Sequence, residues 1–594
     1  MGEIIFFLFA FAVLLSGLIF TRKSEQPRSL FQVILGSFLT ELCIGAIAAK
    51  VCALFSVAVG LRSIGAAYLV VGMLVWIYTV VSKQFQRFRV DLWDVYSILA
   101  IVVWFAVLFL SIFTVGLSNK YINSDPANHF ALALIVMDQG EISGMHFGEL
   151  FNGLILCMFR PFVTWINLYK VYILEDAFAN LINVFMFYLL AVVFCKHKFV
   201  KAILPFLCLG YFLGWPLFNY VLGGFGYLGW GVTLFAYVIY LLMQFYGSEE
   251  KREQALLLAE IGINCIGLAF CYMLFLPILG VLVLLTLIWK IRRDSSFVFS
   301  AKKMIIGCLG LIGMGVVIFL ICFKGYFNGN LQYFFGILSM EGWTHKDLYR
   351  DFIFLLPPFF YMGWHYIKNH QINFAFVSAL TILVFVCSTF VLCLYDVMSS
   401  YYFYKSYYLL WFFLWLMLID AMEYFMEKDK GILAAYGIAF TIPFIMTISG
   451  FDYMLEDRGI VVDEKYSRFY PSFYPILDGY AYYFSEGHNW IEDKEYLIDI
   501  SSFIIDNLSE ETEIPLICCD GRWGYWYYSF TWMDSVYVAN SDELLDALYG
   551  YIQTGHEYVV IHQNHDTYRK VAAQLEEYER IYDNGYYGLY HISQ

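Results

Sequence analysis

The sequence predicts a polytopic α-helical membrane protein of about 14 spans that carries a small α/β domain at its C-terminal end. Hydrophobic residues make up 61% of the chain and charged residues only 14%, whereas soluble domains average about 25% charged residues. Apolar runs of roughly 20 residues, the length that crosses a bilayer core, recur from Glu3 to Gly450. Beyond Gly450 the composition changes abruptly.

The acidic residues gather in the C-terminal quarter of the chain. Residues 451–594 contain 26 acidic and 8 basic residues, a net charge of −18, whereas the whole chain carries −14. A break this sharp marks a domain boundary, and we assign residues 1–450 to a transmembrane domain and residues 451–594 to a soluble domain. The acidic residues 451–594 contain no basic patch, which argues against nucleic acid as a partner.

The basic loops predict how the chain crosses the membrane. Lysine and arginine in short loops mark the cytoplasmic side, and here they occupy alternate loops. This pattern places the soluble domain outside the cytoplasm of a plasma-membrane protein, together with loops 117–170, 323–349 and 395–406. Segment 150–165 is interpreted as non-spanning. Spans are expected near residues 3–20, 30–58, 64–81, 93–116, 171–195, 202–222, 227–246, 255–273, 274–290, 303–322, 350–367, 374–394, 407–426 and 431–449.

Helix and strand patterns alternate in the soluble domain, which indicates a small α/β layer. The hairpin is expected around Asn584-Gly585, a favourable turn dipeptide. Helices are expected at Lys494–Leu508, Asp542–Gln553 and Asp566–Glu579, and strands at Ile514–Cys519, Val536–Ala539, Tyr558–Ile561 and within Arg580–Ile592.

The first outer loop contains the motif Ser124-Asp125-Pro126-Ala-Asn-His129. Pro126 suits the first position of a helix, with Asp125 as its cap. Asp125 and His129 are four residues apart, so a helix places them on one side. An ionisable pair at a membrane surface is a candidate functional site, although a helix cap beside an exposed histidine explains the same letters.

This layout resembles the GT-C class of membrane glycosyltransferases. The match consists of Ser124-Asp125-x-x-x-His129 at the start of a large outer loop, an apolar helix ending near Gly140, and an outer soluble domain. The resemblance implies transfer of a hexose or pentose from a polyprenyl-phosphate carrier to a cell-envelope acceptor such as a cell-wall polysaccharide. It also implies that Asp125 is the general base or a ligand of a divalent cation, Mg or Mn. Pro126 stands where members often carry a second acid, and about four spans precede the loop.

Substrate-binding residues are expected in two further outer segments. A lipid phosphate leaving group needs cationic stabilisation, and Lys405 follows Tyr401 and Tyr402 in one segment, while Lys346 and Arg350 lie in the other. With His129, these residues form the predicted substrate-binding set. The first segment is equally typical of an interfacial aromatic belt with a snorkelling lysine, and the second of an ordinary charged loop.

Three further sequence features can be interpreted either as functional or as purely structural. The aromatic segment 521–532 with Asp520 suits a sugar-binding wall, or else a domain core or a face resting on the membrane. The run Gly224-x-Gly226-x-x-Gly229 matches the dinucleotide fingerprint but lies between expected spans, so we interpret it as a hairpin turn. Glu175 and Asp176, at the start of a span, are interpreted as packing or interfacial residues.

Three alternatives to the glycosyltransferase remain. The first is a polysaccharide polymerase or ligase with a diphosphate-linked donor. The second is a transporter or flippase, which predicts internal repeats and broken helices at the midplane; neither is evident. The third is a non-catalytic envelope protein whose soluble domain recruits partners.

Overall fold

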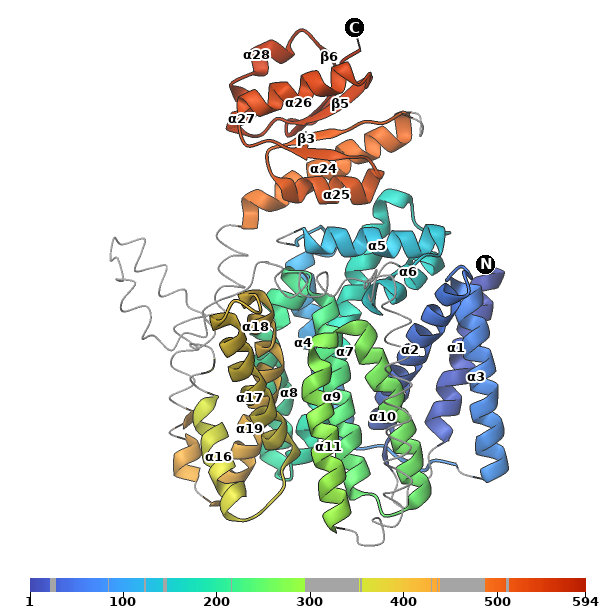
Figure 1. Cartoon of the computed structure of the whole chain (residues 1–594), viewed down its shortest axis with the longest axis vertical. Helices are drawn as coiled ribbons and strands as arrows, with labels where there is room; N and C mark the ends of the chain where they lie inside the picture. The colour runs from blue at the N-terminus through green and yellow to red at the C-terminus, as the bar shows by residue number, and fades with distance from the viewer. Residues whose placement is uncertain are drawn as a thin grey trace.

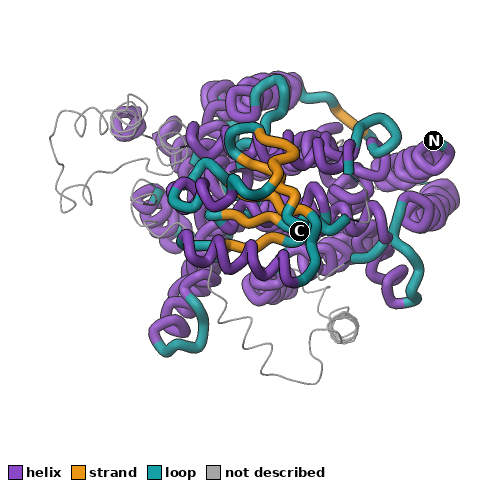
Figure 2. The backbone as a smooth tube through the Cα atoms, turned by 90° about the horizontal axis from the view of Figure 1, so that it is seen from above, coloured by secondary structure: helices purple, strands orange, loops and turns teal. Residues whose placement is uncertain are grey.

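The computed structural model of the chain consists of a helical bundle with an α/β domain at one end (Figure 1). The helices and strands of the C-terminal domain lie beyond the ends of the long helices (Figure 1). Seen from above, the sheet of this domain lies over the middle of the bundle (Figure 2). The structure describes residues 1–21, 28–83, 85–121, 124–142, 147–214, 216–293, 352, 355–428, 430–434, 436–437, 487–508 and 512–593.

Ten helical segments in the described part of the chain are long and apolar enough to cross a membrane. They confirm a polytopic helical membrane protein. The predicted span 303–322 and most of 431–449 lie outside the described residues, so the number 14 stays a prediction. The ten segments are α1 (Gly2–Phe20), α2 (Leu30–Leu54), α3 (Leu61–Ser82), α4 (Leu92–Phe113), η1 (Trp165–Asn167) with α7 (Leu168–Phe194), α9 (Gly226–Gly247), α10 (Lys251–Cys271), η3 (Met273–Phe275) with α11 (Leu276–Arg293), α17 (Phe374–Leu394), and α18 (Ser400–Lys405) with α19 (Tyr407–Lys428).

Two predicted spans correspond to shorter helices. Helix α8 (Lys198–Leu213) is followed by a π-helical turn, η2 (Pro216–Leu222), and the predicted span 202–222 overlaps both. Helix α16 (Leu356–Lys368) has 13 residues. A further feature at one end of the bundle is a minimal parallel pair of strands, β1 (Arg28–Ser29) and β2 (Phe88–Arg89), which joins the starts of α2 and α4.

The loop between α4 and α7 contains two helices that lie across the end of the bundle nearest the C-terminal domain (Figure 1). These are α5 (Asp125–Gln139) and α6 (Phe147–Phe159), and they pack against each other. The 13 residues of α6 extend about 20 Å, short of the roughly 30 Å hydrocarbon core. This length agrees with the prediction that segment 150–165 does not cross the membrane.

The C-terminal domain is built on a five-stranded mixed sheet of order β4-β3-β5-β7-β6. Strand β3 is parallel to β4 and β5, whereas β7 is antiparallel to β5 and β6. Helices α24 and α25 cover the face toward the bundle, and α26 lies on the other side (Figure 1). The strands are β3 (Leu516–Cys518), β4 (Ser535–Tyr537), β5 (Tyr558–His562), β6 (Glu579–Asp583) and β7 (Tyr587–His591); the helices are α24 (Gly487–Asn507), α25 (Gly521–Thr531), α26 (Ser541–Gln553), α27 (Asp566–Arg569) and α28 (Ala572–Leu575).

The domain follows the predicted pattern with two differences. The region 566–579, predicted as one helix, forms the two short helices α27 and α28 before β6. The cap of α26 is Asn540, whose side chain accepts a hydrogen bond from the Glu543 backbone, so the helix begins at Ser541, one residue before the predicted start. The hairpin turn contains Gly585 at φ 86°, a left-handed conformation that glycine adopts without strain.

The aromatic segment 521–532 forms α25 and rests on the outer-loop helices. Trp526 stacks on Tyr121 with ring centroids 6.0 Å apart, and Phe530 meets Phe130 edge-on at 6.3 Å. The indole N–H of Trp165 donates a 2.7 Å hydrogen bond to the Phe530 carbonyl. The inner face of this segment is therefore a buried interface between the two parts of the chain, and not an open sugar-binding wall.

We expect Trp526→Ala to weaken this interface. Trp526 is 1% exposed, and truncating a buried tryptophan costs about 3–5 kcal/mol. Thermal unfolding of the purified chain in detergent should show a lower midpoint. Tyr525→Ala is the matched control because Tyr525 lies on the same helix and is 54% exposed; equal midpoints for the two variants would contradict the interface.

Candidate functional site

The first turn of α5 is positioned by a glycine-containing loop. The helix begins at Asp125 and its N-cap is Ser124, so the prediction that Asp125 caps the helix is wrong by one residue. Gly224, before α9, has φ 72°, and a Cβ atom there would lie 2.0 Å from Pro126 Cγ. Only glycine permits this close approach, so the loop that the sequence predicted as a hairpin turn also holds the start of α5.

His129 lies one turn after Asp125, and the two side chains interact electrostatically as the four-residue spacing predicts. The Nδ1 atom of His129 is 2.5 Å from Oε1 of Glu149 on α6, a distance that places one proton between the two atoms. Its ring centroid lies 5.0 Å from that of Tyr227 at the start of α9. Burial lowers the pKa of His129 to about 4.

Lys405, the last residue of α18, is buried and not a snorkelling side chain. It is 2% exposed, and its ammonium group donates hydrogen bonds to the hydroxyls of Tyr227 and Tyr401. The Nζ atom lies 4.0 Å from the ring centroid of Tyr401 and 4.7 Å from that of Phe225. The aromatic faces and the phenol oxygens thus replace water around this charge.

Asp125 interacts electrostatically with both His129 and Lys405. Burial raises the pKa of Asp125 above its ordinary value, while His129 and Lys405 act in the opposite direction. Lys405 also disfavours protonation of His129. Three of the predicted site residues, from α5 and α18, therefore lie in one electrostatic cluster, which we call the outer cluster and define as Asp125, His129, Glu149, Lys405 and Asp176.

Asp176 was assigned a packing role from the sequence but belongs to the outer cluster. It lies on α7, is 6% exposed, and accepts a 3.1 Å hydrogen bond from the hydroxyl of Tyr121. It also favours the protonated form of His129. A Cβ atom on Gly226 would lie 2.7 Å from Asp176 Oδ1, so the backbone at the start of α9 passes close to this carboxylate.

The C-terminal domain reaches the outer cluster through Lys494 of α24. Its ammonium group donates a hydrogen bond to the Tyr121 carbonyl and lies 5.6 Å from the Trp523 ring centroid. Tyr121 thereby links Lys494 to Asp176. Sequence reasoning missed Glu149, Asp176 and Lys494; the available signal for the two acids was a carboxylate within an apolar helical run.

The other predicted substrate-binding residues are Tyr402, Lys346 and Arg350. Tyr402 is half-buried and meets Tyr401 edge-on at 5.2 Å. Lys346 and Arg350 lie outside the described residues. No group of three or more His, Cys, Asp or Glu side chains within the described ranges is arranged to hold a metal ion, and the Mg or Mn ion at Asp125 stays a prediction.

Comparison with known proteins adds no relative. A scan against family models found no match, and searches of curated proteins and of solved structures found no similar protein. The resemblance to GT-C enzymes therefore stays a prediction, and the outer cluster must be interpreted from its own chemistry.

The lowered pKa of His129 predicts acid sensitivity. Between pH 6.5 and about 4 the unfolded chain takes up a proton on this imidazole and the folded protein does not, so the free energy of unfolding falls as the pH falls. The full effect is on the order of 3 kcal/mol. We expect His129→Gln to flatten the decline in thermal midpoint between pH 7 and 4.5.

The comparison has an internal control, because above pH 7 the midpoints of the wild type and of His129→Gln should change in parallel. Identical slopes below pH 6.5 would show that His129 is not held neutral by its surroundings.

Proposed function

We propose that the protein is a glycosyltransferase that moves a sugar from a polyprenyl-phosphate donor to a cell-envelope acceptor. The observation that carries the proposal is the outer cluster, where a partly buried carboxylate and a buried ammonium interact at the end of a membrane bundle. A carboxylate to accept a proton and a cation to bind a phosphate are the two groups that this reaction requires. Burying ionisable groups within a membrane protein costs free energy, and such groups therefore mark candidate functional sites.

In the proposed reaction, Asp125 is the general base. A hydroxyl oxygen of the acceptor attacks the anomeric carbon of the donor sugar, and the hydroxyl proton passes to Asp125. The bond between the anomeric carbon and the phosphate oxygen breaks, and its electron pair leaves with the polyprenyl phosphate, so the anomeric configuration inverts. The raised pKa of Asp125 suits this role because a stronger base accepts a proton more readily near neutral pH.

Lys405 is the proposed partner of the donor phosphate. An ammonium group has three N–H donors, and two of those of Lys405 go to Tyr227 and Tyr401. These two hydrogen bonds fix the direction of the third N–H bond, which can donate to a phosphate oxygen. Charge-assisted hydrogen bonds of this kind are stronger than neutral ones, and they gain as negative charge develops on the leaving group.

The remaining parts of the site have supporting roles in this proposal. Glu149 orients the His129 ring through the 2.5 Å contact, which holds the imidazole beside Asp125. The soluble domain closes over the site through Lys494 and Tyr121. By the distribution of basic loops, this end of the bundle faces away from the cytoplasm. The proposed acceptor lies on that outer side of the membrane.

Replacing Asp125 by Asn should remove the base without changing its size. We expect the rate of sugar transfer from a polyprenyl-phosphate donor to fall about a hundredfold or more, the usual contribution of a general base. The measurement is release of polyprenyl phosphate by the purified protein in lipid nanodiscs.

Asp138→Asn is the matched control because Asp138 is an exposed acid on the same helix, and it should retain wild-type turnover. Full activity of Asp125→Asn would exclude Asp125 as the base.

Replacing Lys405 by Gln should weaken the donor phosphate contact. Loss of one hydrogen bond to a charged group costs about 1.5–3 kcal/mol, so we expect kcat/KM for the donor to fall about tenfold to a hundredfold while KM for the acceptor changes little. Lys368→Gln, at the exposed end of α16, is the control. An effect confined to the acceptor would place the phosphate elsewhere.

A further inference from the structure

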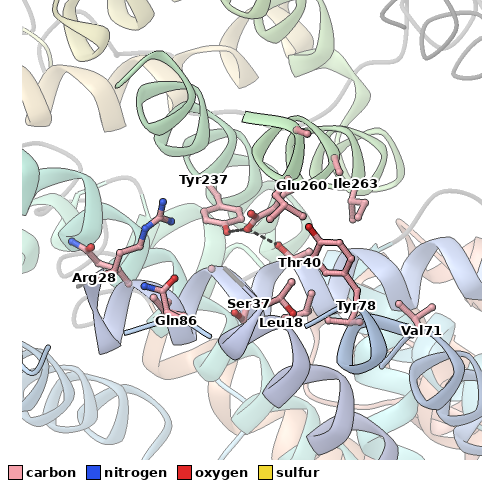
Figure 3. A pocket seen from close by; sticks show the side chains of 18 of the residues that line it. Leu18, Arg28, Ser37, Thr40, Val71, Tyr78, Gln86, Tyr237, Glu260 and Ile263 are labelled. Atoms are coloured by element: carbon pink, nitrogen blue, oxygen red, sulfur yellow. Dashed lines mark hydrogen bonds between the residues drawn. The ribbon is translucent and has the colours of Figure 1, made fainter. Parts of the chain in front are cut away.

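A cavity of about 490 Å³ lies in the bundle among α1, α2, α3, α9 and α10. Figure 3 shows the side chains that line it, with Thr40, Tyr237 and Glu260 in its interior and Arg28 and Gln86 toward one end. This volume falls in the range of about 300–1,000 Å³ that is usual for ligand sites.

The outer cluster lies at the N-terminal end of α9, whereas the cavity lies along the C-terminal half of that helix. Tyr227, which contacts Lys405, is the second residue of α9, whereas Tyr237 and Tyr240 further along the helix line the cavity. The cavity continues to Arg252 at the start of α10. The 22 residues of α9 extend about 33 Å. The cavity is therefore separate from the outer cluster, and its role is independent of the proposed function.

The walls of the cavity are mostly apolar and belong to helices that face the lipid. Leu74 and Val71 on α3 and Leu256 and Ile263 on α10 contribute to them. Leu74 is 61% exposed, as expected for a side chain that touches acyl chains on one side. Helix α2 packs against α1, α3 and α10 and forms the base between them. An apolar space bounded by lipid-facing helices fits a hydrocarbon chain.

The polar groups inside the cavity are bonded to one another. Glu260 accepts hydrogen bonds from the hydroxyls of Tyr237 and Thr40, the latter at 3.2 Å. Asn264 donates to Thr40 Oγ1, also at 3.2 Å. Because two protein hydroxyls already donate to Oε1 of Glu260, an apolar ligand beside that oxygen does not leave it without a hydrogen bond.

The end of the cavity carries positive charge. Arg28 and Arg252 both line it, and Arg28 pairs with Glu253. Arg252 is exposed and makes no ion pair or hydrogen bond to any residue that the structure describes. By the rule for basic loops, this end faces the cytoplasm, the side on which basic pockets between transmembrane helices bind anionic lipid headgroups.

We propose that this cavity binds an anionic phospholipid of the cytoplasmic leaflet. The phosphate lies at Arg252, with Arg28 beside it, and one acyl chain fills the space between α3 and α10. The arginine supplies a planar fork of N–H donors that matches phosphate oxygens, and the apolar walls supply the burial of the chain. The proposal joins two observations: the apolar volume and the uncommitted arginine at its end.

Native mass spectrometry of the full chain tests the proposal. The protein is purified in detergent and exposed to phosphatidylglycerol and phosphatidylcholine with identical acyl chains. We expect preferential retention of phosphatidylglycerol. Arg252→Gln should reduce that retention about fivefold, the effect of one basic residue at a membrane surface, and leave phosphatidylcholine unchanged. Lys251→Gln is the control, since Lys251 is the exposed neighbour and is not among the lining residues.

A second variant tests the volume and not the charge. Ala259 lines the cavity and is exposed there, so Ala259→Trp fills the space from a wall that has room. It should abolish retention of both lipids in protein that still elutes as a monodisperse peak. Equal retention of the two lipids by the wild type, or wild-type retention by Arg252→Gln, would overturn the proposal. Displacement of phosphatidylglycerol by a lower concentration of polyprenyl phosphate would overturn the assignment to phospholipid.

Discussion

The arrangement of the outer end of the bundle depends on the burial of the Lys405 charge. An ammonium group removed from water must be compensated by hydrogen bonds or by opposite charge. Here the hydroxyl of Tyr227 at the start of α9, that of Tyr401 on α18 and the charge of Asp125 on α5 provide the compensation. Because these groups come from three elements, the charge of Lys405 fixes where those elements meet.

The neighbouring contacts follow from that meeting point. The start of α5 can approach α9 only because Gly224 has no side chain, and α9 passes Asp176 only because Gly226 has none. Tyr121 then spans from Asp176 to Lys494 of the C-terminal domain. A chain of polar contacts thus runs from the membrane helices to the soluble domain without an intervening apolar layer.

The sequence-based predictions succeeded where one local pattern determines the structure. Apolar runs of span length predict membrane helices because hydrocarbon leaves the backbone no other way to satisfy its hydrogen bonds. The spacing of Asp125 and His129 predicts a shared helix face because residues four apart are neighbours on the surface of an α-helix. By contrast, Lys405 follows tyrosines in a way that fits an exposed interfacial belt as well as a buried site. Its burial is decided by Phe225 and Tyr227, about 180 residues earlier, and no local pattern encodes that contact. Glu149, Asp176 and Lys494 were missed because their partners lie 20, 55 and 373 residues away along the chain, farther than a local pattern extends.

The buried aromatic face of α25 has a consequence for how the chain can be divided. Trp523, Trp526 and Phe530 are covered in the intact protein, and Trp526 and Phe530 by residues of the membrane part. A fragment containing only the sheet and its helices would present that face to water, and a contiguous apolar surface of this kind favours self-association. The C-terminal domain is therefore not an independent module, and experiments on the isolated domain would report the behaviour of a protein with this apolar face uncovered.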